Sequence, residues 1–152
     1  MNKKLIYIVS GVLALFLVIG LFWVYRTPKP MDVAQNGVYN YSNEDLGFTV
    51  NLPAEFQYFQ TQSKQGDGYK DIEIFIPTTD KAYNQEVPDY AKPLVVRVYE
   101  KDKYKEEPGF EKKGETDDKV YALKFWNDLP KEWEGKWSEE MKNYILNSMK
   151  ID

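Results

Sequence analysis

Residues 66–76 read GDGYKDIEIFI, and this stretch decides the fold class. Its first three residues are a turn signal, because glycine adopts backbone angles that other residues avoid. After the turn, Ile72, Ile74 and Ile76 come at every second position and therefore share one face of a strand. The residues before the turn also alternate, although more weakly. The sequence thus predicts a β-hairpin whose isoleucine face is turned toward a core.

Two more hairpins are predicted around this one. Residues 38–42 and 47–52 alternate on either side of a short polar turn, and residues 110–113 and 120–126 do the same. Residues 94–99 are apolar on both faces, which is typical of a strand in the middle of a sheet. Arg97 interrupts this apolar stretch and needs a partner for its charge.

The end of the chain predicts a helix. Ser138 can cap its first turn, and the helical period runs to about Met149. Met141, Tyr144, Ile145 and Met149 form its expected buried stripe. Antiparallel strands followed by a terminal helix give the α+β class.

Residues 5–25 carry no formal charge, and a helix of this length covers the roughly 30 Å of a bilayer core. Trp23 and Tyr25 lie at its far end, where amphipathic rings favour the headgroup layer. Lys3, Lys4 and the terminal amine favour a cytoplasmic N-terminus. We therefore expect a single-pass anchor in the cell membrane that contacts the lipid bilayer through residues 5–25.

A cleaved signal peptide is the alternative reading of this segment. Its apolar run is longer than that of a signal peptide, and residues 20–27 offer no small-residue cleavage site. The expected organisation is an anchor over residues 1–26, a proline-containing linker over residues 27–37, and one extracytoplasmic domain over residues 38–152.

The part of the chain beyond the anchor is acidic. Without Lys3, Lys4 and Arg26, 17 of the 20 basic residues remain against 24 acidic ones, which gives a net charge of −7. Phosphate backbones repel such a domain, so no nucleic-acid partner is expected. A cationic partner is compatible with this charge.

The chain contains no cysteine and no histidine. Thiol nucleophiles, serine–histidine dyads and cysteine–histidine zinc sites all require one of these two side chains. We expect a non-catalytic protein without a cofactor.

The residues from Tyr41 to Phe56, YSNEDLGFTVNLPAEF, resemble the entry motif of PsbP-like domains, although Phe56 stands where that family more often has tryptophan. Residues 145–151 are similar to the helix and strand that close those domains, with Met149 in place of the usual phenylalanine. The resemblance implies an antiparallel sheet flanked by helices, an α/β/α sandwich. It also implies a non-enzymatic binding or assembly factor; some relatives attach to photosynthetic membranes and one branch binds a small GTPase. No functional residue of that family can be carried over.

Aromatic side chains in predicted loops are the candidate binding residues. Tyr83 and Tyr90 lie in an irregular loop over residues 78–92, and Trp133 and Trp137 follow the last predicted strand. Large flat rings suit peptide or sugar contacts. We expect Trp126, by contrast, to seal the helix against the sheet. The leading hypothesis is an anchored extracytoplasmic domain that contacts another envelope or membrane protein.

Acidic side chains raise two further possibilities, a calcium site and a hydrolase. The groups Asp67/Asp71 and Glu115/Asp117/Asp118 lack the spacing of a calcium loop, so no metal site is predicted. A carboxylate-based hydrolase acting on envelope glycan needs only two acids brought together by the fold. A structural envelope component is the third alternative, and it predicts a large exposed apolar patch.

Overall fold

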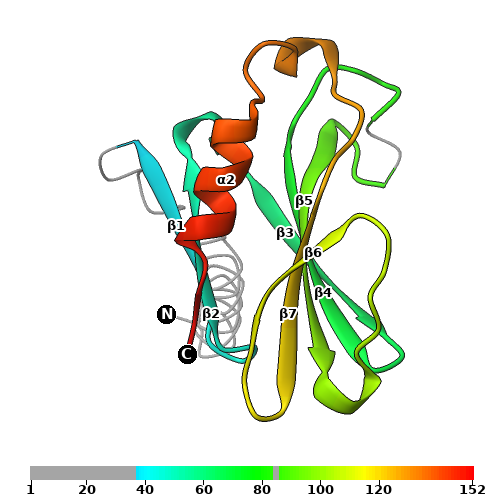
Figure 1. Ribbon diagram of the computed structural model, residues 1–152. Coiled ribbons are helices and arrows are strands. Elements are labelled where there is room, and N and C mark those ends of the chain that lie inside the picture. Colours follow the sequence, from blue (N-terminus) through cyan, green and yellow to red (C-terminus); the bar gives the residue numbers. More distant parts are fainter. Residues whose placement is uncertain (1–36, 84–85) are drawn as a thin grey trace, which may run out of the picture. The chain divides into compact units, whose positions relative to one another are not determined.

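The computed structural model describes residues 37–83 and 86–152, which lie within one compact unit spanning residues 32–152. This part of the chain has an α+β fold with two antiparallel sheets and one α-helix (Figure 1). The α+β prediction is confirmed. The predicted anchor, residues 1–26, and all of the linker except Gly37 lie outside the described residues.

The larger sheet has five strands in the order β3-β4-β5-β7-β6, and all neighbours are antiparallel. Three of its four pairings join strands that follow one another in the sequence. The strands are β3 (Gln60–Gly66), β4 (Tyr69–Pro77), β5 (Tyr90–Glu100), β6 (Phe110–Glu115) and β7 (Lys119–Phe125).

The hairpin predicted from residues 66–76 is present as β3 and β4. Gly68 has a φ of 75° in the turn, a backbone angle that favours glycine. β5 begins at Tyr90, earlier than the strand predicted over residues 94–99. The register shifts between Ile74, which pairs with Leu94, and Ile76, which pairs with Ala91. Pro93 falls inside this irregularity, where the N–H it lacks is not needed for the ladder.

The smaller sheet has the order β1-β2-β8, with β1 over Val38–Asn43, β2 over Phe48–Pro53 and β8 over Lys150–Ile151. A single sheet flanked by helices was expected, and that expectation is wrong for the described residues. The hairpin of β1 and β2 forms a sheet of its own because Pro53 ends β2 and the 3-10 turn η1 (Ala54–Phe56) redirects the chain. The terminal strand β8 then pairs with β2.

The α-helix α2 spans Glu139–Ser148, and the Ser138 Oγ caps it by accepting a hydrogen bond from the Met141 N–H at 3.1 Å. Ile145 and Met149 are buried as predicted. Tyr144 is 41% exposed, so its place in the predicted stripe is wrong. Because Tyr144 directly precedes Ile145, it points about 100° away from that buried position around the helix.

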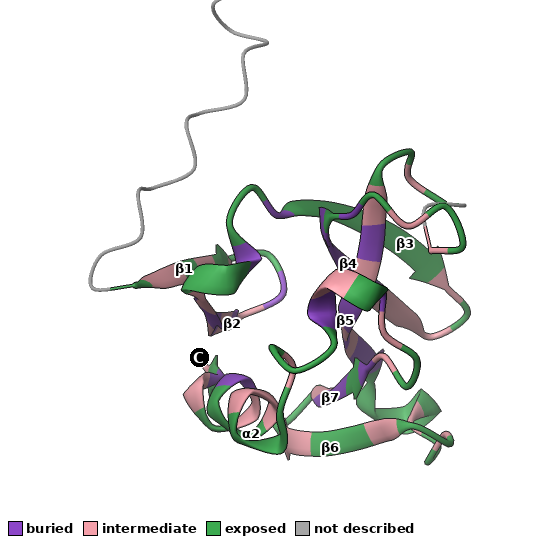
Figure 2. Cartoon of the chain, turned by 90° about the horizontal axis from the view of Figure 1, so that it is seen from above, coloured by how far each residue is buried: buried purple, intermediate pink, exposed green. Residues whose placement is uncertain are grey.

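The core lies between the large sheet and a second layer made of β1, β2 and α2 (Figure 2). Phe56 is fully buried. The Tyr121 hydroxyl donates to the Leu46 carbonyl at 2.8 Å and connects the layers. Isoleucine, leucine and valine side chains from the facing strands fill the interior: Val50, Leu52, Ile72, Ile74, Ile76, Leu94, Val96, Val98 and Leu123.

Two short 3-10 turns complete the described fold, η2 over Lys101–Lys103 and η3 over Lys131–Trp133. Within residues 37–83 and 86–152, no helix combines the length and apolarity that crossing a bilayer would require.

Candidate functional site

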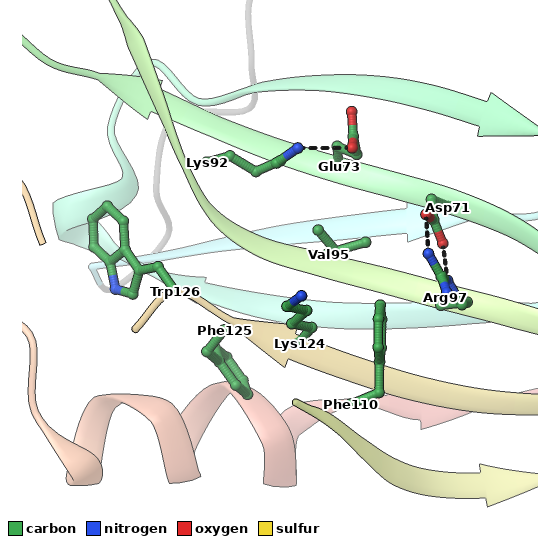
Figure 3. Close-up of a pocket in the computed structure, with 9 residues that line it drawn as sticks. All are labelled: Asp71, Glu73, Lys92, Val95, Arg97, Phe110, Lys124, Phe125 and Trp126. Atoms are coloured by element: carbon green, nitrogen blue, oxygen red, sulfur yellow. Dashed lines mark hydrogen bonds and ion pairs between the residues drawn. The ribbon is translucent and has the colours of Figure 1, made fainter. Parts of the chain in front are cut away.

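The outer face of the large sheet, opposite the core, carries charged side chains with very little exposure. Asp71 and Glu73 on β4 are 6% and 4% exposed. They alternate with the core-facing isoleucines, so they must point outward. Among the described elements none is a second layer over this face, and the two carboxylates are covered by neighbouring side chains of the sheet and its connections, some of which Figure 3 draws.

Arg97 lies at the centre of this face and bonds two of its carboxylates. Its Nε and Nη2 donate to the two Asp71 oxygens at 2.7 and 2.8 Å, and its Nη1 donates to Glu107 Oε2 at 2.7 Å. The guanidinium carbon lies 3.7 Å from the Tyr69 ring centroid and 4.3 Å from that of Phe110. Burial lowers the pKa of Arg97, but the hydrogen bonds and charges of its partners outweigh this and raise it. The predicted need for a partner is thus confirmed.

Glu73 belongs to a second ionic cluster. Its Oε1 accepts hydrogen bonds from Lys92 Nζ at 2.9 Å and from Lys64 Nζ at 3.1 Å. Both lysines also reach Glu86, and the hydrogen bond from Lys92 is the largest effect that lowers the Glu86 pKa. The Glu73 Oε2 is buried and has no hydrogen-bond partner. Both outer-face carboxylates are therefore held by cations.

Lys124 is a further cation at this face. It projects from β7 between the ion pairs and the aromatic rings, and its Nζ lies 5.6 Å from the Phe110 ring centroid (Figure 3). Among the described residues no carboxylate lies within ion-pair distance of Lys124, and its side chain is exposed. A ligand at this face would therefore meet an ammonium group, that of Lys124, that no carboxylate of the described residues occupies.

Three hollows adjoin at the ring of Phe110, and together we call them the Phe110 groove. The central hollow, about 210 Å³, lies over Val95 and contains the ion pairs and Lys124. The second, about 450 Å³, is lined by Trp126 and Trp137, and we call it the tryptophan pocket. The third, about 380 Å³, is lined by Tyr104, Glu106, Glu107, Pro108, Phe110 and Lys112.

The tryptophan segment is divided between the core and the groove. Trp133 is only 5% exposed, and its ring packs against Phe56 at 5.8 Å and Trp126 at 5.4 Å between centroids. Trp137 is half-buried and lines the tryptophan pocket with Trp126. The Trp126 Nε1 is buried and has no hydrogen-bond partner. Of the two predicted tryptophans, Trp137 thus lies at a hollow and Trp133 lies in the core.

The two predicted tyrosines lie apart from the groove lining. Tyr90 is the first residue of β5 and pairs with Pro77. Tyr83 is half-buried in the preceding loop, where burial and then the charges of Asp128, Asp80 and Glu134 raise its pKa. The structure therefore brings Tyr83 near the tryptophan segment, while Tyr90 belongs to the sheet.

Glu132 fastens this loop to the tryptophan segment. Its Oε1 accepts hydrogen bonds from the Thr78 hydroxyl at 2.5 Å and from the Thr79 N–H at 2.9 Å. The bond from Thr78 is the largest effect that lowers the Glu132 pKa. The start of the loop is thereby held in a defined place beside η3.

Sequence reasoning missed Phe110, Lys124 and Glu139 as groove residues. The position of Lys124 between Leu123 and Phe125 predicts that it points outward from β7. The sequence does not predict which side chains surround it there. Phe110 follows a Pro-Gly turn, and only the pairing of β6 with β7 sets it opposite Lys124. Trp126 was expected to seal the helix against the sheet. It also lines the tryptophan pocket, and this could not be predicted because the pocket is formed by residues distant in the sequence.

The acidic groups weighed for calcium are used otherwise. Asp71 is paired with Arg97, and Glu115 is bonded by Lys112 and Lys101, which lower its pKa to about 2. Across residues 37–83 and 86–152, no cluster of three potential metal ligands is present.

Comparisons of the chain with protein-family models, with curated proteins and with solved structures find no match. The geometry of the groove is therefore the basis for a functional proposal.

Proposed function

We propose that this chain is a membrane-anchored, extracytoplasmic, non-catalytic domain that binds another envelope or membrane protein through the Phe110 groove. The observation that carries the proposal is the run of three adjoining hollows on an outer face without a covering layer. Aromatic rings form much of its wall, and interfaces favour such rings because they bury large areas at little entropic cost.

The ionic network supports binding over hydrolysis. A glycoside hydrolase needs one protonated carboxyl and one free carboxylate on either side of the scissile bond. Asp71 is bonded by Arg97, and Glu73 accepts from two lysines, so cations of the chain already occupy both carboxylates and neither is free to flank a scissile bond. Fixed charges of this kind instead orient a partner and exclude mismatched ones.

The alternative of a structural envelope component has less support. That role favours a broad apolar surface for lateral packing. In the part of the chain that the structure describes, the exposed large hydrophobic residues are Tyr58, in the turn between η1 and β3, and Tyr144, on α2. A hollowed, partly charged face suits a specific partner better.

The anchor and the PsbP-like relationship are parts of the same proposal. The uncharged run over residues 5–25 supports a membrane location, with the N-terminus in the cytoplasm and residues 38–152 outside. The entry and closing motifs, which fall on the β1–β2 hairpin and on α2 with β8, support the family. Recovery of a soluble protein trimmed near Arg26 would contradict the anchor.

Co-purification from solubilised native membranes tests the binding proposal. Tagged full-length protein carrying Lys124→Glu or Trp137→Leu should lose its captured partner. Lys150→Glu and Tyr144→Leu are matched controls, since both residues are exposed and neither lines the groove. Capture that survives both groove variants, or that fails equally in the controls, would argue against the groove as the binding site.

The four residues predicted from sequence receive a separate test in the same assay. Replacing Tyr83, Tyr90 and Trp137 one at a time by leucine or phenylalanine ranks their contributions. Trp133 needs a folding control, because its ring is in the core. We expect the largest loss of capture for Trp137, the member of this set that lines a hollow.

A further inference from the structure

The tryptophan pocket has two indole walls set nearly at right angles. The ring planes of Trp126 and Trp137 meet at 83° with their centroids 5.5 Å apart. Indole is the aromatic side chain that attracts cations most strongly, through the negative potential of its ring face. Two such rings at a corner are a known arrangement for recognising positively charged groups.

The lysines that line the groove lie over other aromatic rings than these two indoles. The Lys142 Nζ lies 5.6 Å from the Phe125 ring centroid, and Lys124 lies at the same distance from Phe110. Within residues 37–83 and 86–152, no cationic side chain lies over Trp126 or Trp137. The strongest cation-binding rings of the pocket are thus the ones that the chain itself does not use.

The charge of the pocket also favours a cation. Its lining contains two carboxylates, Glu111 and Glu139, and one ammonium group, that of Lys142. Lys142 is paired with Glu111, whereas Glu139 has no ion pair among the described residues. The net charge of −7 beyond the anchor attracts a cationic partner at longer range.

We infer that the tryptophan pocket binds a lysine or arginine side chain of the protein partner, an inference that rests on the proposed function. The hollow of about 450 Å³ accommodates a long side chain whose aliphatic stem packs on Leu129 and whose charge meets the indoles and Glu139.

Nuclear magnetic resonance of the full-length protein in detergent micelles, with ¹⁵N-labelled tryptophan, tests this inference. The probe is the peptide Gly-Gly-Arg-Gly-Gly, and Gly-Gly-Gln-Gly-Gly is its uncharged control. The indole signals of Trp126 and Trp137 should shift saturably with the arginine peptide. The glutamine peptide should bind about tenfold more weakly, since it lacks the cation. The Trp133 signal reports an intact core.

Two variants separate charge recognition from folding. Glu139→Gln should weaken arginine-peptide binding about threefold, as expected for an exposed charge pair. Glu140→Gln is the matched control, because it also lies in the first turn of α2 but does not line the pocket. Trp137→Leu should abolish the shift of the Trp126 signal while the Trp133 signal stays in place.

Three results would overturn the inference. These are equal binding of the two peptides, equal effects of the two glutamine variants, or tighter binding of tetramethylammonium than of the arginine peptide. The last would assign the pocket to a quaternary ammonium headgroup. If partner capture depends on Lys124 while the arginine peptide does not bind, the proposed function stands and this inference fails. If the arginine peptide binds but the groove variants still capture the partner, the proposed function fails instead.

Discussion

The two faces of the large sheet differ in how they are buried, although they alternate along the same strands. On the inner face, Ile72 and Ile74 are at most 3% exposed because β1, β2 and α2 cover them. On the outer face, Asp71 and Glu73 are almost as inaccessible, but side chains of the same sheet and its connections bury them. A face buried by its own ion pairs leaves hollows that a partner can fill, and a face covered by a second layer does not.

The largest effect should come from the inner face. Ile74→Ala removes a fully buried side chain and should lower the free energy of unfolding by about 3 kcal/mol, because the cavity cannot collapse between two layers. Val95→Ala, on the half-buried floor of the groove, should cost less than about 1 kcal/mol. Urea denaturation of both variants measures the difference. Equal losses would mean that the two faces are packed alike.

Breaking the outer-face ion pair should have the next largest effect. Asp71→Asn leaves the Arg97 guanidinium, 11% exposed, without its bidentate partner and should destabilise the domain by about 2 kcal/mol. The double variant Asp71→Leu with Arg97→Met should recover part of this loss, because it removes both buried charges and leaves only Glu107 without a partner, whose side chain is 40% exposed and can be hydrated. A double variant that is less stable than the single one would contradict this account of the outer face.

The hydrogen bonds from Thr78 and Thr79 to Glu132, which we call the loop clamp, predict that the stability of the domain depends on pH. Glu132 has a pKa below its ordinary value of 4.5, so its contribution to stability is fully present above pH 4.5 and is lost as the pH falls through the lowered pKa. Glu132→Gln should be less stable than the wild type at pH 7, and the difference should shrink toward pH 3. Thermal unfolding across this range measures it. A difference that does not change with pH would show that the clamp is not ionic.

The smallest effect on stability should come from Lys124→Ala. Its side chain is exposed and has no ion-pair partner among the described residues, so the free energy of unfolding should change by less than about 0.5 kcal/mol. Urea denaturation measures this change. Partner capture should nonetheless fall in the same variant. A large loss of stability would mean that Lys124 supports the fold and would weaken its use as a probe of the groove.

The inner face could be predicted from sequence because its signal is local. Period-two isoleucines, glycine turns and the Ser138 cap fixed the hairpins and the helix to within a few residues. The division into two sheets was missed, because it depends on how the chain leaves β2 after Pro53. No local pattern encodes that direction.

The groove could be predicted only in part. A charge within an apolar strand showed that Arg97 needed a partner, but the identity of Asp71 depends on the register of β4 and β5. The cluster of tryptophans after the last predicted strand pointed to both Trp133 and Trp137; Trp137 lines a hollow, whereas Trp133 belongs to the core. Contacts between distant strands decide which aromatic ring lines a hollow and which fills the interior.

Photocrosslinking in the native membrane tests the central claim most directly. A photoreactive residue placed at Lys124 in the Phe110 groove should give a specific adduct with one membrane or envelope protein. The same residue at Asn40, exposed on β1, should give none. Adducts of equal yield from both positions, or an adduct from Asn40 alone, would contradict the assignment of the groove as the binding surface.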